Sequence, residues 1–207
     1  MEEAKLFLIT YFAAFLGVIP PGLVNMTVAK TCVEQGKKNG LYVAVGASFI
    51  VLLQAFIAVL LANYIFSNPF VQNILLRAGL VIFIILGIYF FVKAKREEGI
   101  EHQSETAKSN SIFKGMLIAV LNVFPIPYFV AIAGALNIGV GAFYPWLKIF
   151  SFTLAGAIGT FTSLYLYVVF FNKIEGKTES FSRFSNYFMA LLMLVLIVIT
   201  LFRIYTS

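Results

Sequence analysis

The sequence predicts an all-α membrane protein in which six transmembrane helices form a single domain over residues 1–207. The chain is 61% hydrophobic and only 12% charged, about half the charged fraction of an ordinary soluble domain. Its apolar residues lie in long uncharged runs, and a membrane-spanning helix needs about 20 such residues. Most basic residues fall between these runs. The chain is therefore expected to have almost no water-soluble part.

The uncharged runs define the expected helices. Two runs, 39–76 and 115–147, are too long for one helix, and each contains a turn signal, at 67–69 and at 137–145. Each of these runs therefore predicts two helices, and the second helix of the chain is expected near 41–65 and the third near 70–92. The complete set of runs is 6–29, 39–76, 78–92, 115–147, 149–172 and 184–202.

The basic residues predict an orientation in the membrane. The loops that follow the first, third and fifth helices lie on one side, and they hold eleven of the fifteen lysines and arginines. The positive-inside rule places these loops in the cytoplasm and both termini outside the cell membrane. The bilayer is therefore the expected partner of the basic loops, and the net charge of +6 is no sign of a nucleic-acid partner. The eleven are Lys30, Lys37, Lys38, Lys93, Lys95, Arg96, Lys108, Lys114, Lys173, Lys177 and Arg183.

The chain is expected to contain an inverted repeat of three plus three helices. A polar segment of mixed charge, 95–111, is the expected cytoplasmic linker between half-repeats at about 1–94 and 112–207. An odd number of helices per half gives the halves opposite orientations, as in many secondary transporters. Shifted by 105 residues, the first helix aligns with the fourth, and small residues of the second helix recur in the fifth. The matches are Ala14/Ala119, Leu16/Leu121, Val18/Val123, Pro20/Pro125 and Val45-Gly46-Ala47/Ala155-Gly156-Ala157.

Prolines are predicted to break the first and fourth helices. Pro20-Pro21-Gly22 lies at the same expected membrane depth as Pro125 and Pro127. A proline removes a backbone donor and clashes with the preceding turn, and freed backbone groups in a membrane must be buried in protein or line a wet cavity. Two breaks at one depth in matching parts of two half-repeats predict a binding site. Purely structural kinks remain the alternative.

Polar residues beside the breaks are the candidate substrate-binding groups. Asn25 and Thr27 follow the first break, Asn122 precedes the second, and Tyr128 follows it. The amino termini of the half-helices that begin near Gly22 and Tyr128 would direct positive dipole ends at a carboxylate. The asparagines could accept an ammonium or hydroxyl group, or could fasten the bundle by interhelical hydrogen bonds. The candidate set is Pro20, Pro21, Gly22, Asn25, Thr27, Asn122, Pro125, Pro127 and Tyr128.

Several classes of chemistry have no support in the sequence. The chain has no aspartate, and its glutamates lie in loops or at helix ends, so Glu34 is the nearest candidate for proton coupling. A surface ion pair with Lys30 at i,i+4 spacing is the alternative for Glu34. Gln54 is expected to be structural. Because motifs for a nucleophile, a metal or a nucleotide are missing, we expect neither an enzyme nor a cofactor, and the lone Cys32 excludes an internal disulfide.

The chain resembles the LysE/RhtB family of amino-acid exporters over nearly its full length. The resemblance lies in Gly17 with Pro20-Pro21-Gly22, in glycines of the next loop and helix, and in two further segments. It implies export of amino acids driven by the proton-motive force. The remaining matching residues are Gly36, Gly40, Gly46, Leu76-Arg77-Ala78-Gly79, Leu86-Gly87, Phe113-Lys114-Gly115 and Leu121-Asn122.

Two functions remain open at this stage. The first is a secondary transporter that exports amino acids or similar small zwitterions and binds them between the two broken helices. The second is a non-transporting partner or chaperone subunit of a membrane complex. The small residues Gly156, Ala157 and Gly159 permit close helix approach within or between chains, so a homo-oligomer is also open.

Overall fold

The computed structural model describes residues 2–20, 22–95, 111–122, 124–138 and 146–171, together with 187, 190–191, 193–195, 197–202 and 204–205. The regular secondary structure of these residues is entirely α-helical, as the sequence predicts. Most of the predicted linker and most of the turn at 137–145 fall outside the described residues. The extents of the domain and of its half-repeats remain predictions.

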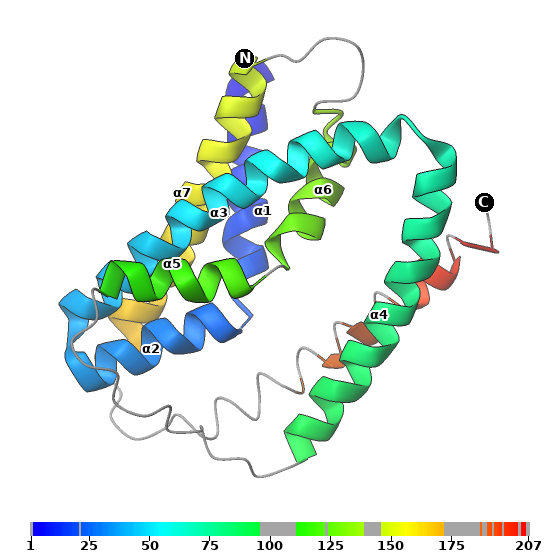
Figure 1. Ribbon diagram of the computed structural model, residues 1–207. Helices are drawn as coiled ribbons and strands as arrows, with labels where there is room; N and C mark the ends of the chain where they lie inside the picture. The colour runs from blue at the N-terminus through cyan, green and yellow to red at the C-terminus, as the bar shows by residue number, and fades with distance from the viewer. Residues whose placement is uncertain are drawn as a thin grey trace. The chain divides into compact units, whose positions relative to one another are not determined.

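The chain divides into two compact units. Unit 1 comprises Met1–Ser67 and Thr106–Glu175, and unit 2 comprises Asn68–Glu105 and Gly176–Ser207. Unit 1 contains six of the named helices and unit 2 contains α4 (Figure 1). The helices are α1 (Glu2–Val18), α2 (Leu23–Gln35), α3 (Lys37–Phe66), α4 (Pro69–Lys95), α5 (Ser111–Leu121), α6 (Pro125–Ala135) and α7 (Trp146–Phe171).

Two pairs of short helices in unit 1 are sharply bent. The axes of α1 and α2 differ by 69°, and those of α5 and α6 differ by 68°. Pro20 lies between the first pair, and Pro125 begins α6, where its missing N–H group would have no intrahelical partner in any case. In the described part of the chain, α3 and α7 are long and apolar enough to cross a membrane, and each bent pair can be counted as one further span.

The long helices α3 and α7 hold the bent pairs together. α7 packs along α1, α2 and α3, and α3 also packs along α2, α5 and α6 (Figure 1). Glycines make the closest crossings: a Cβ atom at Gly46 would overlap the Ile112 carbonyl oxygen, and one at Gly159 would overlap that of Tyr11. Small residues of this kind allow the backbones of membrane helices to approach closely.

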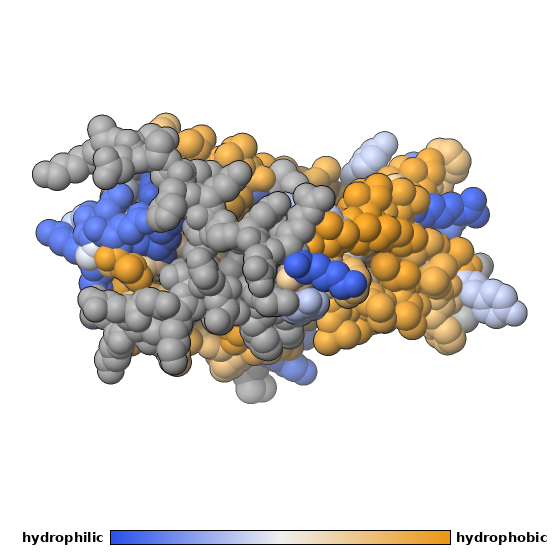
Figure 2. Space-filling view, turned by 90° about the horizontal axis from the view of Figure 1, so that it is seen from below, coloured by the Kyte–Doolittle hydropathy of each residue, from blue (hydrophilic) through white to orange (hydrophobic). Residues whose placement is uncertain are grey.

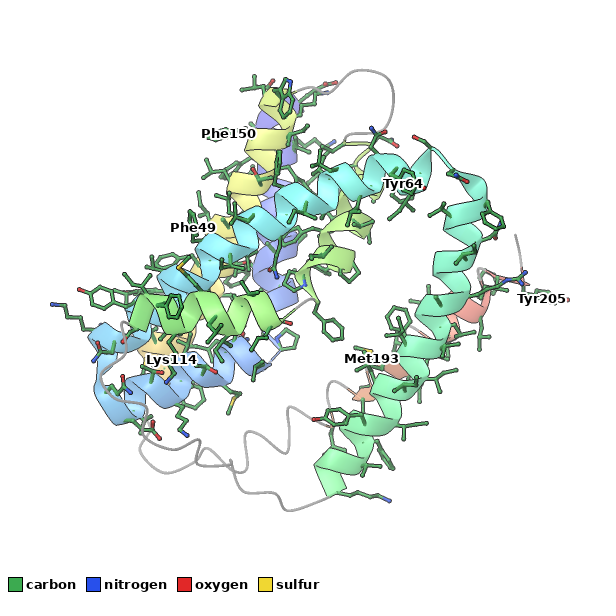
Figure 3. The ribbon with its side chains drawn as sticks, in the orientation of Figure 1. Phe49, Tyr64, Lys114, Phe150, Met193 and Tyr205 are labelled. Carbon is green, nitrogen blue, oxygen red and sulfur yellow. The ribbon has the colours of Figure 1, made fainter. Side chains whose placement is uncertain are left out.

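Side chains of α1, α3, α6 and α7 form the apolar core of unit 1. Phe129 and Phe152 are at most 2% exposed and meet edge to face, with ring centroids 5.8 Å apart. Most of the residues around them on α3 are alanines and valines. Large apolar side chains such as Phe49 and Phe150 instead point outward from the ribbon (Figure 3). An outside as apolar as the core suits a lipid environment and would be unusual for a soluble protein.

Unit 2 consists of α4 and the described residues near the carboxyl terminus. The surface over α4, on the right in Figure 2, is mainly hydrophobic, and Ile82, Ile85 and Ile88 are all exposed on it. A Cβ atom at Gly87 would lie 3.4 Å from the Cβ of Met193, so these two segments touch. α4 contains the third predicted helix, as α3 contains the second.

The glycine crossings yield a first prediction. Replacing Gly46 by leucine should destabilise the protein by about 1–3 kcal/mol, because the side chain would overlap the backbone of α5 and force the helices apart. The neighbouring Val45→Leu change is the control, since Val45 is exposed. Thermal unfolding in detergent should show a lower midpoint for Gly46→Leu alone. Equal midpoints for the two variants would contradict the close crossing.

Candidate functional site

Side chains bind the carbonyl groups that the first break leaves without helical partners. The Asn25 amide nitrogen donates hydrogen bonds to the carbonyl oxygens of Val18 and, at 3.1 Å, Pro20. The Tyr167 hydroxyl donates to the Ile19 carbonyl oxygen at 2.6 Å. The last carbonyls of a helix have no intrahelical donor, so Asn25 and Tyr167 supply donors where the backbone cannot.

At the second break, a side chain from a different helix binds the carbonyl groups. The Gln54 amide nitrogen donates to the carbonyl oxygens of Ala119 at 3.0 Å and Asn122 at 2.9 Å. Gln54 belongs to α3 and is only 6% exposed. Asn122 contributes its carbonyl oxygen to this contact, and its own N–H donates to Ile118 at 3.1 Å. Gln54 was expected to be structural, and here it closes the end of α5.

The helices that supply these donors run parallel to the first segment of each bent pair. The Lys148 ammonium lies 3.7 Å from the Glu2 carboxylate at the start of α7 and α1, and Tyr167 meets Ile19 near their ends. Likewise the Ser111 hydroxyl donates to the side-chain oxygen of Asn39 at 3.4 Å near the starts of α5 and α3. The Gln54 amide nitrogen donates to the Asn122 carbonyl oxygen further along the same two helices. Each break is therefore held by the long helix that lies beside it.

Tyr128 connects the two bent pairs directly. Its hydroxyl, on α6, donates to the Ala13 carbonyl oxygen of α1 at 2.6 Å. Its ring lies against Gly17, where a Cβ atom would be 2.6 Å from the ring and the hydroxyl oxygen. A larger residue at Gly17 would displace the ring. Tyr128 thus links α1 of the first bent pair to α6 of the second.

The other predicted site residues have simpler surroundings. The Thr27 hydroxyl donates to the Leu23 carbonyl oxygen of its own helix at 2.8 Å. Glu34 lies 3.7 Å from Lys30, so the predicted ion pair is present. Gly22 has open space where a side chain would stand. Pro125 and Pro127 lie in the first turn of α6, and Pro21 falls outside the described residues.

A lysine lies between α2 and α5, on the side of the breaks where the loops are basic. The half-buried Lys114 ammonium donates to the Thr31 hydroxyl at 3.3 Å (Figure 3). The sequence indicated Lys114 as a loop charge and as part of the segment that resembles the family, and did not single out Tyr167. The signal for Tyr167 was its spacing of four residues from Ser163 in an apolar helix.

The described side chains that bind the carbonyls at the breaks are neutral hydrogen-bonding groups. Among the described residues, no three His, Cys, Asp or Glu side chains come close enough to hold a metal ion. What the two breaks share is a backbone that leaves the helix in an apolar surrounding and side chains that bind its carbonyls. Backbone of this kind is tolerated at membrane depth where it is buried in protein or lines a polar cavity.

Comparison with known protein families gives a match over residues 15–203 to the LysE type translocator family. The chain belongs to the LysE type translocator family. The match includes both breaks and both long helices, and it agrees with the resemblance seen in the sequence. No curated protein and no solved structure matches the chain.

Membership of this family makes the chain a membrane transporter that exports small solutes. The family assignment fits the apolar surface of unit 1 and the ability of α3 and α7, among the described helices, to span a membrane. It also gives the breaks a functional context, because transporter sites are typically built from discontinuous helices.

The donors at the breaks yield a second prediction for this translocator. Gln54→Leu and Tyr167→Phe should each destabilise it by about 1 kcal/mol, because each removes a side-chain donor to a carbonyl group at a break. Tyr165→Phe is the matched control, since Tyr165 is an exposed residue of the same helix. Chemical unfolding in detergent measures the difference. If Tyr167→Phe were as stable as Tyr165→Phe, the proposed role of the hydroxyl would be wrong.

Proposed function

We propose that this translocator exports amino acids or similar small zwitterions and binds them mid-membrane between its two broken helices. The observation that carries the proposal is the pair of matching bends, 69° and 68°, within one compact unit of a LysE type translocator. At each bend one helix ends and the next begins, and Tyr128 lies between the two bent pairs. The solute would bind where these termini face one another.

The termini suit a zwitterion because they carry partial charges of both signs. α2 and α6 begin at the breaks and α1 and α5 end there. Amino termini of helices favour a carboxylate, and carbonyl-bearing ends favour an ammonium group. The proposed binding residues are those predicted from the sequence, namely Pro20, Pro21, Gly22, Asn25, Thr27, Asn122, Pro125, Pro127 and Tyr128. Glu34 remains the proposed proton-coupling residue.

Hydrogen bonding across the two halves supports an inverted three-plus-three repeat, in which prolines break the first and fourth spans. The repeat aligns the first helix with the fourth at a shift of 105 residues, and the second helix with the fifth at a shift of 110 residues. Ile19 then corresponds to position 124, and Tyr167 corresponds to position 57. The bonded pair in the other half is Asn122 and Gln54, less than one helical turn away in each case. A long helix from each half thus holds the break of the other half.

An inverted repeat supplies a simple mechanism for export. Rocking of one set of helices against the other would open the site first to one side and then to the other. The basic residues Lys30, Lys37, Lys38 and Lys114 lie on α2, α3 and α5 at one end of unit 1. The positive-inside rule supports placing this end in the cytoplasm and both termini outside.

A flux measurement tests the proposed function. Proteoliposomes preloaded with neutral, acidic or basic amino acids should release at least one of them faster than protein-free vesicles. Asn25→Leu should slow that release about tenfold, because it removes the amide that binds two carbonyls at the first break. Asn73→Leu is the control, since Asn73 is exposed on α4.

Two results would count against transport of amino acids. If the wild-type protein released none of the panel, the substrate assignment would fail. If it also co-purified with one membrane partner and moved no solute, a role as a partner subunit would replace it.

A further inference from the structure

Four polar oxygens inside unit 1 have no hydrogen-bond partner within the described part of the chain. They are the hydroxyls of Thr10, Thr160 and Ser163 and the amide oxygen of Gln54. These residues are 0%, 2%, 1% and 6% exposed. A buried polar group without a partner is costly, and native proteins contain few of them. Four in one unit therefore call for a physical explanation.

Burial alone does not leave a helical hydroxyl unbonded in this protein. Thr162 donates to the Ile158 carbonyl oxygen at 2.9 Å, as serine and threonine commonly do within a helix. The buried hydroxyls of Ser48 and Thr153 also donate to carbonyls of their own helices, at 2.8 and 3.1 Å. Thr160 and Ser163 lie on the same helix as Thr162 and do not make this bond.

The unbonded hydroxyls of α7 share one interior face. Gly156, Thr160, Ser163 and Tyr167 follow at spacings of four, three and four residues, which places them on one side of a helix. The face begins at Gly156, against the ring of Phe129, and ends at Tyr167, which reaches the first break. A polar face therefore extends from the apolar core of unit 1 to the break.

Thr10 of α1 lies within about one helical turn of Thr160. A Cβ atom at Gly159 would overlap the carbonyl oxygen of Tyr11. Tyr11 directly follows Thr10, and Gly159 directly precedes Thr160. Because the two helices run parallel here, the two hydroxyls are separated along the helix axis by less than about one turn.

Gln54 of α3 lies about one helical turn from Thr160 along α7. A Cβ atom at Gly156 would be 3.8 Å from the Cβ of Ala55, the residue after Gln54, and Gly156 is about one turn from Thr160. The Gln54 amide nitrogen is bonded to two carbonyls at the second break, which fixes the amide and leaves its oxygen as a free acceptor. Three helices thus bring residues with unbonded oxygens to within about one helical turn of Thr160, and we call this set the oxygen layer.

The chemistry of this layer indicates what it would bind. Its four oxygens are uncharged acceptors, and an ammonium group offers three donors and no acceptor. In transporters, neutral oxygens at broken helices also coordinate alkali cations. We propose that the oxygen layer of Thr10, Gln54 and Thr160, extended one turn by Ser163, binds a monovalent cationic group. That group is an alkali cation or, if the proposed transport function holds, the ammonium of the solute.

Thermal unfolding of the purified full-length protein tests the oxygen layer. Sodium or potassium chloride is compared with choline chloride at equal ionic strength, and amino acids are compared with their N-acetyl derivatives. At least one small cation or free amino acid should raise the unfolding midpoint, and its larger or acetylated counterpart should not. Thr160→Val and Thr10→Val should raise the half-saturating concentration about tenfold, since each removes one hydrogen-bond acceptor for a charged group.

Matched variants keep the test independent of folding. Thr162→Val should respond like the wild type, because that hydroxyl is bonded within its own helix, and Thr160→Ser should respond like the wild type because it keeps the hydroxyl. The inference is wrong if no probe stabilises the wild type. It is also wrong if Thr160→Val and Thr162→Val respond equally.

The outcomes separate this site from the proposed function. Stabilisation by an alkali cation without any amino-acid release would support the oxygen layer and contradict amino-acid export. If amino acids were released, but cations and free amino acids stabilised the wild type and Thr160→Val equally, export would be supported and the oxygen layer contradicted.

Discussion

A broken helix inside a membrane needs donors for the carbonyl groups that the break exposes, and this constraint determines the architecture of unit 1. Lipid cannot supply those donors. At the first break they come from Asn25 and Tyr167, and at the second from Gln54. Asn25 reaches the first break from its own span, but Tyr167 and Gln54 reach the breaks from other helices, so α7 must follow α1 closely and α3 must follow α5. The glycines at these crossings make that approach sterically possible.

The same interactions are well suited to a protein that changes conformation. Side-chain hydrogen bonds to carbonyl groups contribute only about 1 kcal/mol each to stability, so they hold the bends without making them permanent. The unbroken helices α3 and α7 provide a continuous scaffold, whereas α1/α2 and α5/α6 each contain a bend at which the direction of the chain can change. Tyr128 of α6 joins the two bent pairs through its hydrogen bond to the Ala13 carbonyl oxygen of α1.

The sequence predicted the parts of this arrangement that depend on local chemistry. Long apolar runs gave α3 and α4, since hydropathy alone determines which segments prefer lipid. The bonding partners at the breaks depend on the register between helices, which no local pattern contains. Asn25 was expected either to bind a solute or to make a structural hydrogen bond between helices, and its amide nitrogen binds carbonyls of its own broken span. Gln54 was expected to be structural, which agrees with its bonds to the carbonyls of the second break, whereas a sequence pattern does not show which serines and threonines bond within their own helix.

Accessibility of the breaks to water is the most direct test of the claim that they form the transport site. In a Cys32→Ser background, single cysteines at Gly22, at Phe124 and at the outward-facing control Phe49 would be treated with a water-soluble thiol reagent in membranes. The account predicts that both break positions react, that a transported solute slows both reactions, and that the lipid-facing Phe49→Cys variant stays unlabelled. If neither break position reacted, the breaks would be structural kinks in a dry interior.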